Sequence, residues 1–248
     1  MESDEDFIDI EVRSADEVAR RCIVLASLLQ IVAFDQGQPG FAVDDLETTA
    51  FDRREWLRGN DLWRDVAHSE ATVFERPLDL ERSAASFDPL LLGETLATLG
   101  WALGACSRLL PLQATSPVEI ASQVPEPWDS PWTWIASQQL GNESEFVAQR
   151  ELAELWLWRI ETELARREAP VQDRLEIDSA ISDVRSEAIE AGIFPGSPSL
   201  DYLALWDDIA HRDVDELASL QSLSEQRLKT LNWICGFGAD WDHVPLDV

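Results

Sequence analysis

The sequence predicts an all-α protein, a single orthogonal bundle of about eight helices with a Pro-rich central loop. Apolar residues recur at the three- and four-residue spacing of amphipathic helices along most of the chain, and no stretch sustains the period of two typical of strands. Residue types that begin and end helices stand at the borders of these stretches. With 248 residues, 45% of them apolar, the chain is large enough to bury a substantial core.

Helix-starting residues justify the elements of the first half. Ser14 and Glu17 have the spacing of a capping box, and Asp88 is an N-cap followed by Pro89 at the first helical position. The helix after Asp88 is apolar on almost all sides, which predicts a place in the middle of the fold. Four helices are expected here: from Ser14 to beyond Val32, around residues 53–58, from Ser69 to before Pro77, and from Asp88 to about Leu110.

The second half follows a segment with five prolines between Pro111 and Pro131, where no regular period is visible. Five further helices are expected: from about Asn142 to Glu168, Glu176–Ala191, Ser199–His211, Asp213–Gln221 and Ser224–Cys235. We therefore expect an acidic N-terminal tail over residues 1–12 and one helical domain over residues 13–248. Within this domain, residues 13–110 and 142–248 form two helical halves that share a core, and residues 111–141 are a Pro/Trp-rich connection.

The net charge of −29 limits the binding partners. Forty-eight acidic residues face nineteen basic ones, of which Lys229 is the only lysine, so binding to nucleic acid or to an anionic membrane is not expected. Three interpretations stay open: solubility in a crowded or saline cytosol, a basic protein partner, and mimicry of nucleic acid. The distant cysteines Cys22, Cys106 and Cys235 and an acidic N-terminus without signal-peptide character favour a cytoplasmic protein.

The most distinctive residues stand at the C-terminus, where Leu231-Asn232-Trp233 is followed by Asp240-Trp241-Asp242 and Asp247. In these motifs the chain resembles a bacterial family of domains of unknown function, family 4272, and the resemblance extends over about residues 12–248. The resemblance implies no activity, because the family has none established. The family pattern places Glu-Arg-His where this chain has Gln226-Arg227-Leu228, which argues against a shared hydrolytic site. Weaker agreements are Arg13-Ser14, Trp56-Leu57, Leu62-Trp63, Ser69-Glu70 and Gly100-Trp101-Ala102-Leu103-Gly104.

A polar clamp is the first candidate site. Asn232 lies on an apolar helix, and a buried amide must find hydrogen-bond partners. We expect it to bond the turn at Asp240–Asp242 or the Arg13 end of the first helix. Arg227 is expected to pair with Asp240 or Asp242, and Trp241 to fill the core. The candidate set, structural or binding, is Arg13, Arg227, Asn232, Trp233, Asp240, Trp241 and Asp242.

A second candidate is a pocket or groove lined by tryptophans, since eleven tryptophans face a single tyrosine in the composition. The alternative is that these indoles simply fill the core. The residues concerned are Trp128, Trp132, Trp134, Trp156 and Trp158. Metal binding has a weaker basis: Asp207 and His211 share a helix face, and Asp240 and Asp242 carry neighbouring carboxylates. No cofactor is expected, because no phosphate loop, Rossmann glycine pattern or zinc-protease motif is present.

These observations favour a non-enzymatic helical module that binds a partner, and a regulatory or immunity-type role is compatible with them. Absent catalytic motifs, strong acidity and clustered aromatic residues are the reasons. The alternative is a metal-assisted enzyme or small-molecule binder that uses Glu154, His211, Asp240 and Asp242. A second alternative is an acidic mimic of nucleic acid. The sequence does not indicate an oligomeric state.

Overall fold

The prediction of an all-α protein is confirmed. A computed structural model describes residues 10–35, 46–75, 87–105, 109, 112, 121, 123–194 and 202–247, and this part of the chain contains nine α-helices and no strand. The helices are α1 (Ala15–Asp35), α2 (Leu46–Gly59), α3 (His68–Glu75), α5 (Pro89–Ala102), α7 (Pro131–Ser137), α8 (Glu143–Glu168), α9 (Arg174–Glu190), α10 (Tyr202–Asp208) and α11 (Val214–Ile234). Short 3-10 turns lie at η1 (Trp63–Asp65), η4 (Ile209–His211) and η5 (Trp241–His243).

Several helices begin where side-chain chemistry dictates. The Glu17 amide donates to the Ser14 hydroxyl, and the Ser14 amide donates to the Glu17 carboxylate, so this capping box starts α1. The Asp88 carboxylate accepts from the amide of Leu90 at the start of α5, with Pro89 at the first helical position. Each cap satisfies amides that the helix itself leaves without an acceptor.

Three elements differ from the expectation. The two helices expected between Asp213 and Cys235 are one helix, α11, because nothing between Gln221 and Ser224 breaks the hydrogen-bond ladder. Helix α7 lies inside the connection that was expected to lack regular structure, and it begins at Pro131, where the missing amide costs nothing. Helix α5 ends at Ala102 instead of near residue 110, and Gly104 follows with a left-handed backbone (φ 77°).

The main core draws on both sides of the Pro/Trp-rich connection. It combines the apolar faces of α1 and α5 with Phe146 and Leu157 of α8 and with Leu228 and Leu231 of α11. Ile10 and Val12 of the expected N-terminal tail also pack against it, while residues 1–9 lie outside the described part. A second, smaller cluster joins α8, η4 and α11 through Ile160, Ile209 and Leu217.

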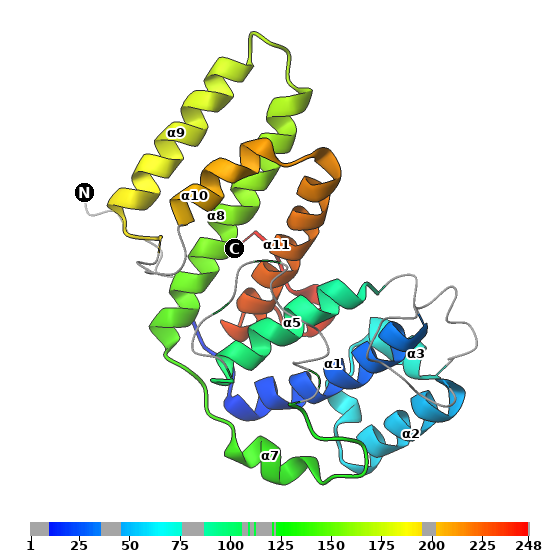
Figure 1. Cartoon of the computed structure of the whole chain (residues 1–248). Helices are drawn as coiled ribbons and strands as arrows, with labels where there is room; N and C mark the ends of the chain where they lie inside the picture. The colour runs from blue at the N-terminus through cyan, green and yellow to red at the C-terminus, as the bar shows by residue number, and fades with distance from the viewer. Residues whose placement is uncertain are drawn as a thin grey trace.

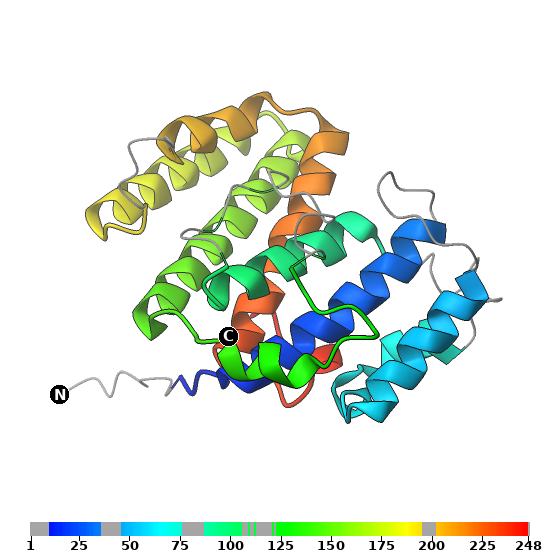
Figure 2. The ribbon, with the colours of Figure 1, turned by 60° about the horizontal axis from the view of Figure 1, so that its bottom comes forward.

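Helices α8, α11, α5 and α1 pack in that order, each against the next (Figure 1). Helix α11 packs along α8 and crosses α5, whereas α5 and α1 lie side by side. Helices α8, α9 and α10 form one end of the molecule, and α1, α2, α3 and α7 form the other, an arrangement also visible in Figure 2. None of the helices in the described ranges has the length and apolar character to cross a membrane.

Candidate functional site

The C-terminal segment is fastened to the body of the protein. Trp241 in η5 packs edge-to-face on Trp233 in α11, with ring centres 5.3 Å apart. The Asp240 carboxylate accepts hydrogen bonds from the amides of Asp242 and His243, which caps η5. Asp242 accepts from the amide and hydroxyl of Ser69 at the start of α3 (3.3 and 2.6 Å). Of the two carboxylates in the Asp-Trp-Asp motif, Asp240 therefore caps η5 and Asp242 makes a long-range contact with Ser69.

Arg13 closes the N-terminal segment onto the same region. Its Nε donates to the carbonyl of Trp233 and its Nη2 to the carbonyl of Gly238, both at 2.8 Å, while the guanidinium lies 4.5 Å from the centre of the Trp233 ring. Gly236 lets the two chain ends approach, because its backbone is left-handed (φ 86°) and a Cβ there would lie 2.2 Å from the carbonyl oxygen of Glu11.

Asn232 is fully buried and joins three separate parts of the chain. Its Oδ1 accepts from Nε of Arg150 in α8, and its Nδ2 donates to the carbonyl of Pro245, both at 2.8 Å. These partners correct the expectation that Asn232 would bond the turn at Asp240–Asp242 or the end at Arg13. Through these bonds Asn232 joins α8, α11 and the C-terminal segment.

Arg227 has a different partner from the one expected. Its Nε donates to Oε1 of Glu94 in α5 at 2.5 Å, and both side chains are largely buried. Neither Asp240 nor Asp242 pairs with it, because those carboxylates lie at η5 and serve as caps there. The ion pair instead joins α5 to α11 in the interior, where an unpaired charge would be costly.

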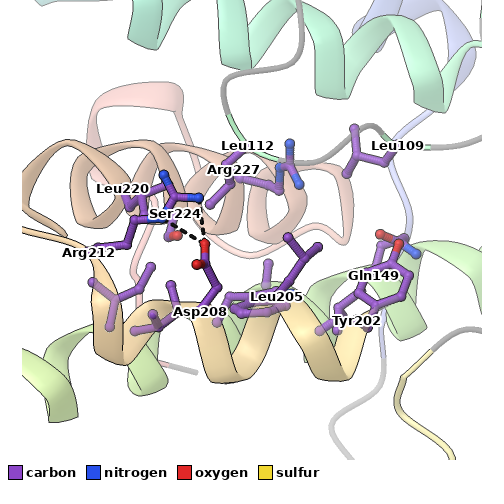
Figure 3. A pocket seen from close by; sticks show the side chains of 15 residues that line it. Leu109, Leu112, Gln149, Tyr202, Leu205, Asp208, Arg212, Leu220, Ser224 and Arg227 are labelled. Carbon is purple, nitrogen blue, oxygen red and sulfur yellow. Dashed lines mark hydrogen bonds and ion pairs between the residues drawn. The ribbon is translucent and has the colours of Figure 1, made fainter. Parts of the chain in front are cut away.

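A pocket of about 130 Å3 opens beside Arg227, between α8, α10 and α11 (Figure 3). Most of its wall is apolar and includes Ala153, Trp156 and Leu205. Figure 3 shows the ion pair of Asp208 and Arg212 at one end of the pocket. Its polar lining consists of Gln149, Tyr202, Asp208, Arg212, Ser224 and Arg227. Apolar walls with a few convergent polar groups are typical of small-molecule sites.

Ser224 is the polar group that stands out in this pocket. Its side chain is 1% exposed, and within the described residues its hydroxyl has no hydrogen-bond partner. A buried hydroxyl without a partner costs free energy, so its presence at a pocket wall indicates a place for a ligand atom. By contrast, the charges nearby are neutralised: Asp208 Oδ2 accepts from Nε and Nη2 of Arg212 at 2.8 and 2.6 Å, and Arg227 pairs with Glu94.

The five tryptophans expected to surround one groove lie in two separate places, which corrects that hypothesis. Trp128, Trp132 and Trp134 lie in or just before α7, which packs against α1, and the guanidinium of Arg20 lies 4.8 Å from the Trp132 ring centre. Trp156 and Trp158 lie on α8, with ring centres 5.9 and 6.3 Å from that of the buried Trp206 in α10. Only Trp156 of the five lines the pocket of Figure 3.

The residues considered for a metal site are also apart. Asp207 in α10 pairs with Arg185 (3.7 Å), Glu154 pairs with Arg150 (3.8 Å), and Asp240 bonds His243 in η5. His211 is exposed at the end of η4, which follows α10, whereas Asp240 and Asp242 lie at η5 after α11. Across the described ranges, no three His, Cys, Asp or Glu side chains are grouped so as to hold a metal ion. The combined site of Glu154, His211, Asp240 and Asp242 is therefore not formed.

Two of the cysteines are buried free thiols. Burial raises the pKa of Cys22 to about 12 and that of Cys235 to about 11, so both stay protonated at neutral pH. They pack as small apolar side chains in the main core. Cys106 lies outside the described residues.

A second cavity, of about 350 Å3, lies where α1, α3, α5, α11 and η5 meet. Lys229, Gln226, Trp241 and Asp242 line it. Lys229 follows Arg227 by two residues, so the helical repeat turns it to the opposite side of α11 from the pocket of Figure 3. Residues of α11 therefore line both cavities.

Sequence reasoning missed Ser224, Tyr202 and Trp206, and it noted Lys229 only as a rare residue type. A usable signal was present for one of them. Leu220, Ser224 and Arg227 follow the four- and three-residue spacing of a single helix face, but this was hidden because the helix was divided at residue 222. The positions of Tyr202 and Trp206 in the sequence do not indicate that these residues pack against α8.

The described part of the chain defines an all-α protein in which both the pocket beside Arg227 and the cavity beside Lys229 are large enough for small ligands. The chain belongs to the DUF4272 family, described as a domain of unknown function, whose family model matches residues 4–190. The match covers the seven described helices from α1 to α9, whereas α10, α11 and the C-terminal motifs lie beyond it. No match was found among curated proteins or among solved structures.

Proposed function

We propose that this protein binds a small, uncharged and mostly apolar molecule in the pocket between α8, α10 and α11. The single observation that carries the proposal is the buried Ser224 hydroxyl, which lacks a partner in the described part of the chain and lines a pocket with apolar walls. A ligand atom able to accept or donate one hydrogen bond would complete this site. Binding, without chemistry, is the simplest role for such a pocket.

Size and charge narrow the ligand class. The pocket volume of about 130 Å3 is close to that of an apolar cavity of about 150 Å3 that holds benzene. One aromatic ring or a compact branched chain therefore fits between Trp156 and Leu205. Since Arg227 and Arg212 are already paired with Glu94 and Asp208, the polar lining favours an uncharged group such as a hydroxyl.

Phenol and toluene are suitable probes, because they share the ring and differ in the hydroxyl. Ligand-observed NMR titration of the wild type should give tighter binding of phenol, by roughly twofold to tenfold, the range of one hydrogen bond. Ala153→Leu, which fills the pocket wall, should abolish binding of both probes, whereas Ala136→Leu on the exposed side of α7 should not. Binding unaffected by Ala153→Leu would sink the proposal.

A second candidate is a basic protein partner that docks at α7. It is supported by Trp128, which is 78% exposed, and by Trp132, which is 39% exposed, on a chain with a net charge of −29. Exposed tryptophans are frequent anchors of protein interfaces. A basic test protein should bind the wild type and lose affinity for Trp128→Ser. If the wild type and Trp128→Ser bind the basic protein with equal affinity, binding is due to general charge attraction alone and a docking site at α7 is ruled out.

A further inference from the structure

The second cavity is lined by apolar and polar side chains and by one amine, that of Lys229. Lys229 is the only lysine among 248 residues, and its half-buried side chain lines this cavity of about 350 Å3. Leu25, Phe87 and Leu91 supply apolar surface. The volume exceeds that of the benzene-binding cavity mentioned above, so a ligand with a ring and a substituent fits. The site is independent of the pocket proposed to bind phenol, since the two share no lining residue and lie on opposite sides of α11.

Lys229 has no close ion partner among the described residues of this cavity. Within the described residues, no carboxylate oxygen forms an ion pair with its Nζ, although Asp242 lines the same cavity. Asp242 is instead held by Ser69, and Glu70 is bound by both terminal nitrogens of Arg21. The contact that the amine does make is with Trp241, whose ring centre lies 5.5 Å from Nζ.

The electrostatic setting lowers the pKa of the amine. Burial, together with the positive charge of Arg21, lowers the pKa of Lys229 below its usual value, although Asp242, Glu70 and Asp240 act in the opposite direction. The Arg21 guanidinium lies 4.1 Å from the centre of the same Trp241 ring, which explains its influence. Desolvation and a neighbouring cation are the two devices that make a lysine nucleophilic in proteins.

We propose that Lys229 is a carbonyl-reactive amine that forms an imine with a small uncharged aldehyde or ketone in this cavity. The ammonium first releases a proton to solvent, and the nitrogen lone pair attacks the carbonyl carbon to form a C–N bond. The resulting carbinolamine loses its hydroxyl, with a proton, as water, which leaves the C=N bond. The net change consumes no oxidant or reductant: ammonium and carbonyl give imine, water and one proton.

The walls of the cavity select against anionic carbonyl compounds. Asp88 and Asp242 line it, Glu70 is neutralised by Arg21, and Lys229 is the one cationic residue among the described residues that line the cavity, so an acid such as pyruvate meets repulsion. An uncharged aldehyde with an apolar body instead contacts Leu25 and Phe87. The Ser69 and Thr95 hydroxyls already donate to Asp242 and to the Leu91 carbonyl, but Nε2 of Gln226 donates one hydrogen to Thr95 and has a second for the carbonyl oxygen during attack.

The single lysine allows a clean test. The wild type and the Arg64→Lys variant, which adds an ordinary amine at an exposed site, are incubated at neutral pH with benzaldehyde and cyanoborohydride, and the reduced adducts are located by peptide mass mapping. We expect Lys229 to be labelled severalfold faster than the amine introduced at position 64, and Lys229→Arg to lose this adduct. Labelling of Lys229 at the same rate as the introduced amine, or slower, would overturn the proposal.

A second arm tests the selectivity of the cavity. Pyruvate replaces benzaldehyde in the same two proteins, so that the ratio of labelling at Lys229 to labelling at position 64 is measured for each carbonyl. This ratio should fall severalfold with pyruvate, because the introduced amine lies outside the acidic cavity. An equal ratio for both carbonyls would show that the cavity walls do not select the ligand and would contradict the assignment of an uncharged carbonyl compound.

Discussion

Arg227 and Glu94 form a largely buried ion pair that joins α11 to α5 between the two cavities. Residues 220, 224 and 227 of α11 face the pocket that we propose binds a small apolar molecule, whereas residues 226 and 229 face the cavity of the lysine. The two sets lie on opposite sides of the helix, as its repeat requires. The ion pair thereby fixes the wall that the two cavities share.

Removing one charge of this pair should be costly. Glu94→Gln leaves the Arg227 guanidinium buried without its carboxylate, and we expect a loss of about 3–5 kcal/mol in the free energy of unfolding. Urea denaturation measures it. Glu55→Gln, which removes solvent-accessible ion pairs with Arg54 and Arg58, is the control and should change stability by about 1 kcal/mol or less. Equal effects of both substitutions would show that the interior pair is not structurally important.

Asn232→Ala should loosen the connection between α8, α11 and the C-terminal segment. The substitution leaves Nε of Arg150 and the carbonyl of Pro245 without their buried partner, at a cost of about 1–3 kcal/mol. Thermal melting should therefore shift downward by several degrees. The exposed Gln139→Ala serves as the control amide, and a melting temperature as high in Asn232→Ala as in this control would refute the clamp.

Gly236 tests the contact between the two ends of the chain. Gly236→Ala places a methyl group against the Glu11 carbonyl in a left-handed backbone, so both clash and strain contribute. Gly192→Ala has a similar backbone (φ 72°) with open space around it and isolates the strain, at about 1 kcal/mol. We expect Gly236→Ala to lose clearly more stability in chemical denaturation. If the two losses are equal, residues 10–12 do not press on Gly236 in solution.

The contact between Asp242 and Ser69 predicts a pH dependence. Burial tends to raise the pKa of Asp242, but hydrogen bonds from Ser69 and His68 and the charge of Lys229 together lower it. A lowered pKa in the folded state stabilises the fold above the unfolded value of about 3.9, and this contribution disappears as the pH falls through the folded value.

Asp242→Asn should accordingly lower the free energy of unfolding by about 1 kcal/mol at pH 7, a value reduced by solvent screening. The difference from the wild type should shrink as the pH falls below about 4. Denaturation at a series of pH values, with the exposed Asp129→Asn as control, measures it. If the difference in the free energy of unfolding grows as the pH falls, the contact between Asp242 and Ser69 does not stabilise the fold through the ionised carboxylate.

Much of the helical architecture was predictable because its causes are local. The capping box at Ser14, the cap at Asp88 and the cap at Asn142 are encoded within four residues, and each begins a helix in the structure. The unbroken length of α11 was not predicted, since two helices, Asp213–Gln221 and Ser224–Cys235, were expected there. The serine between them continues the helix, and its hydroxyl donates to the Ala218 carbonyl one turn earlier.

The candidate site was less predictable, because its contacts join residues far apart in the sequence. An amide on an apolar helix predicted that Asn232 would need hydrogen-bond partners. Its partner Arg150 is 82 positions away, and nothing in the sequence around Arg150 indicates the contact. Likewise, Ser224 looks like an ordinary surface serine until α8 and α10 pack around it. The sequence thus indicated residue types for a polar interior but not their pairing.

The most direct test of the central proposal is a crystal structure of the protein soaked with phenol. We expect electron density for the ring between Trp156 and Leu205, with the phenol oxygen within hydrogen-bond distance of the Ser224 hydroxyl. An empty pocket at a phenol concentration that saturates binding in solution, or density only at the exposed Trp128, would contradict the account.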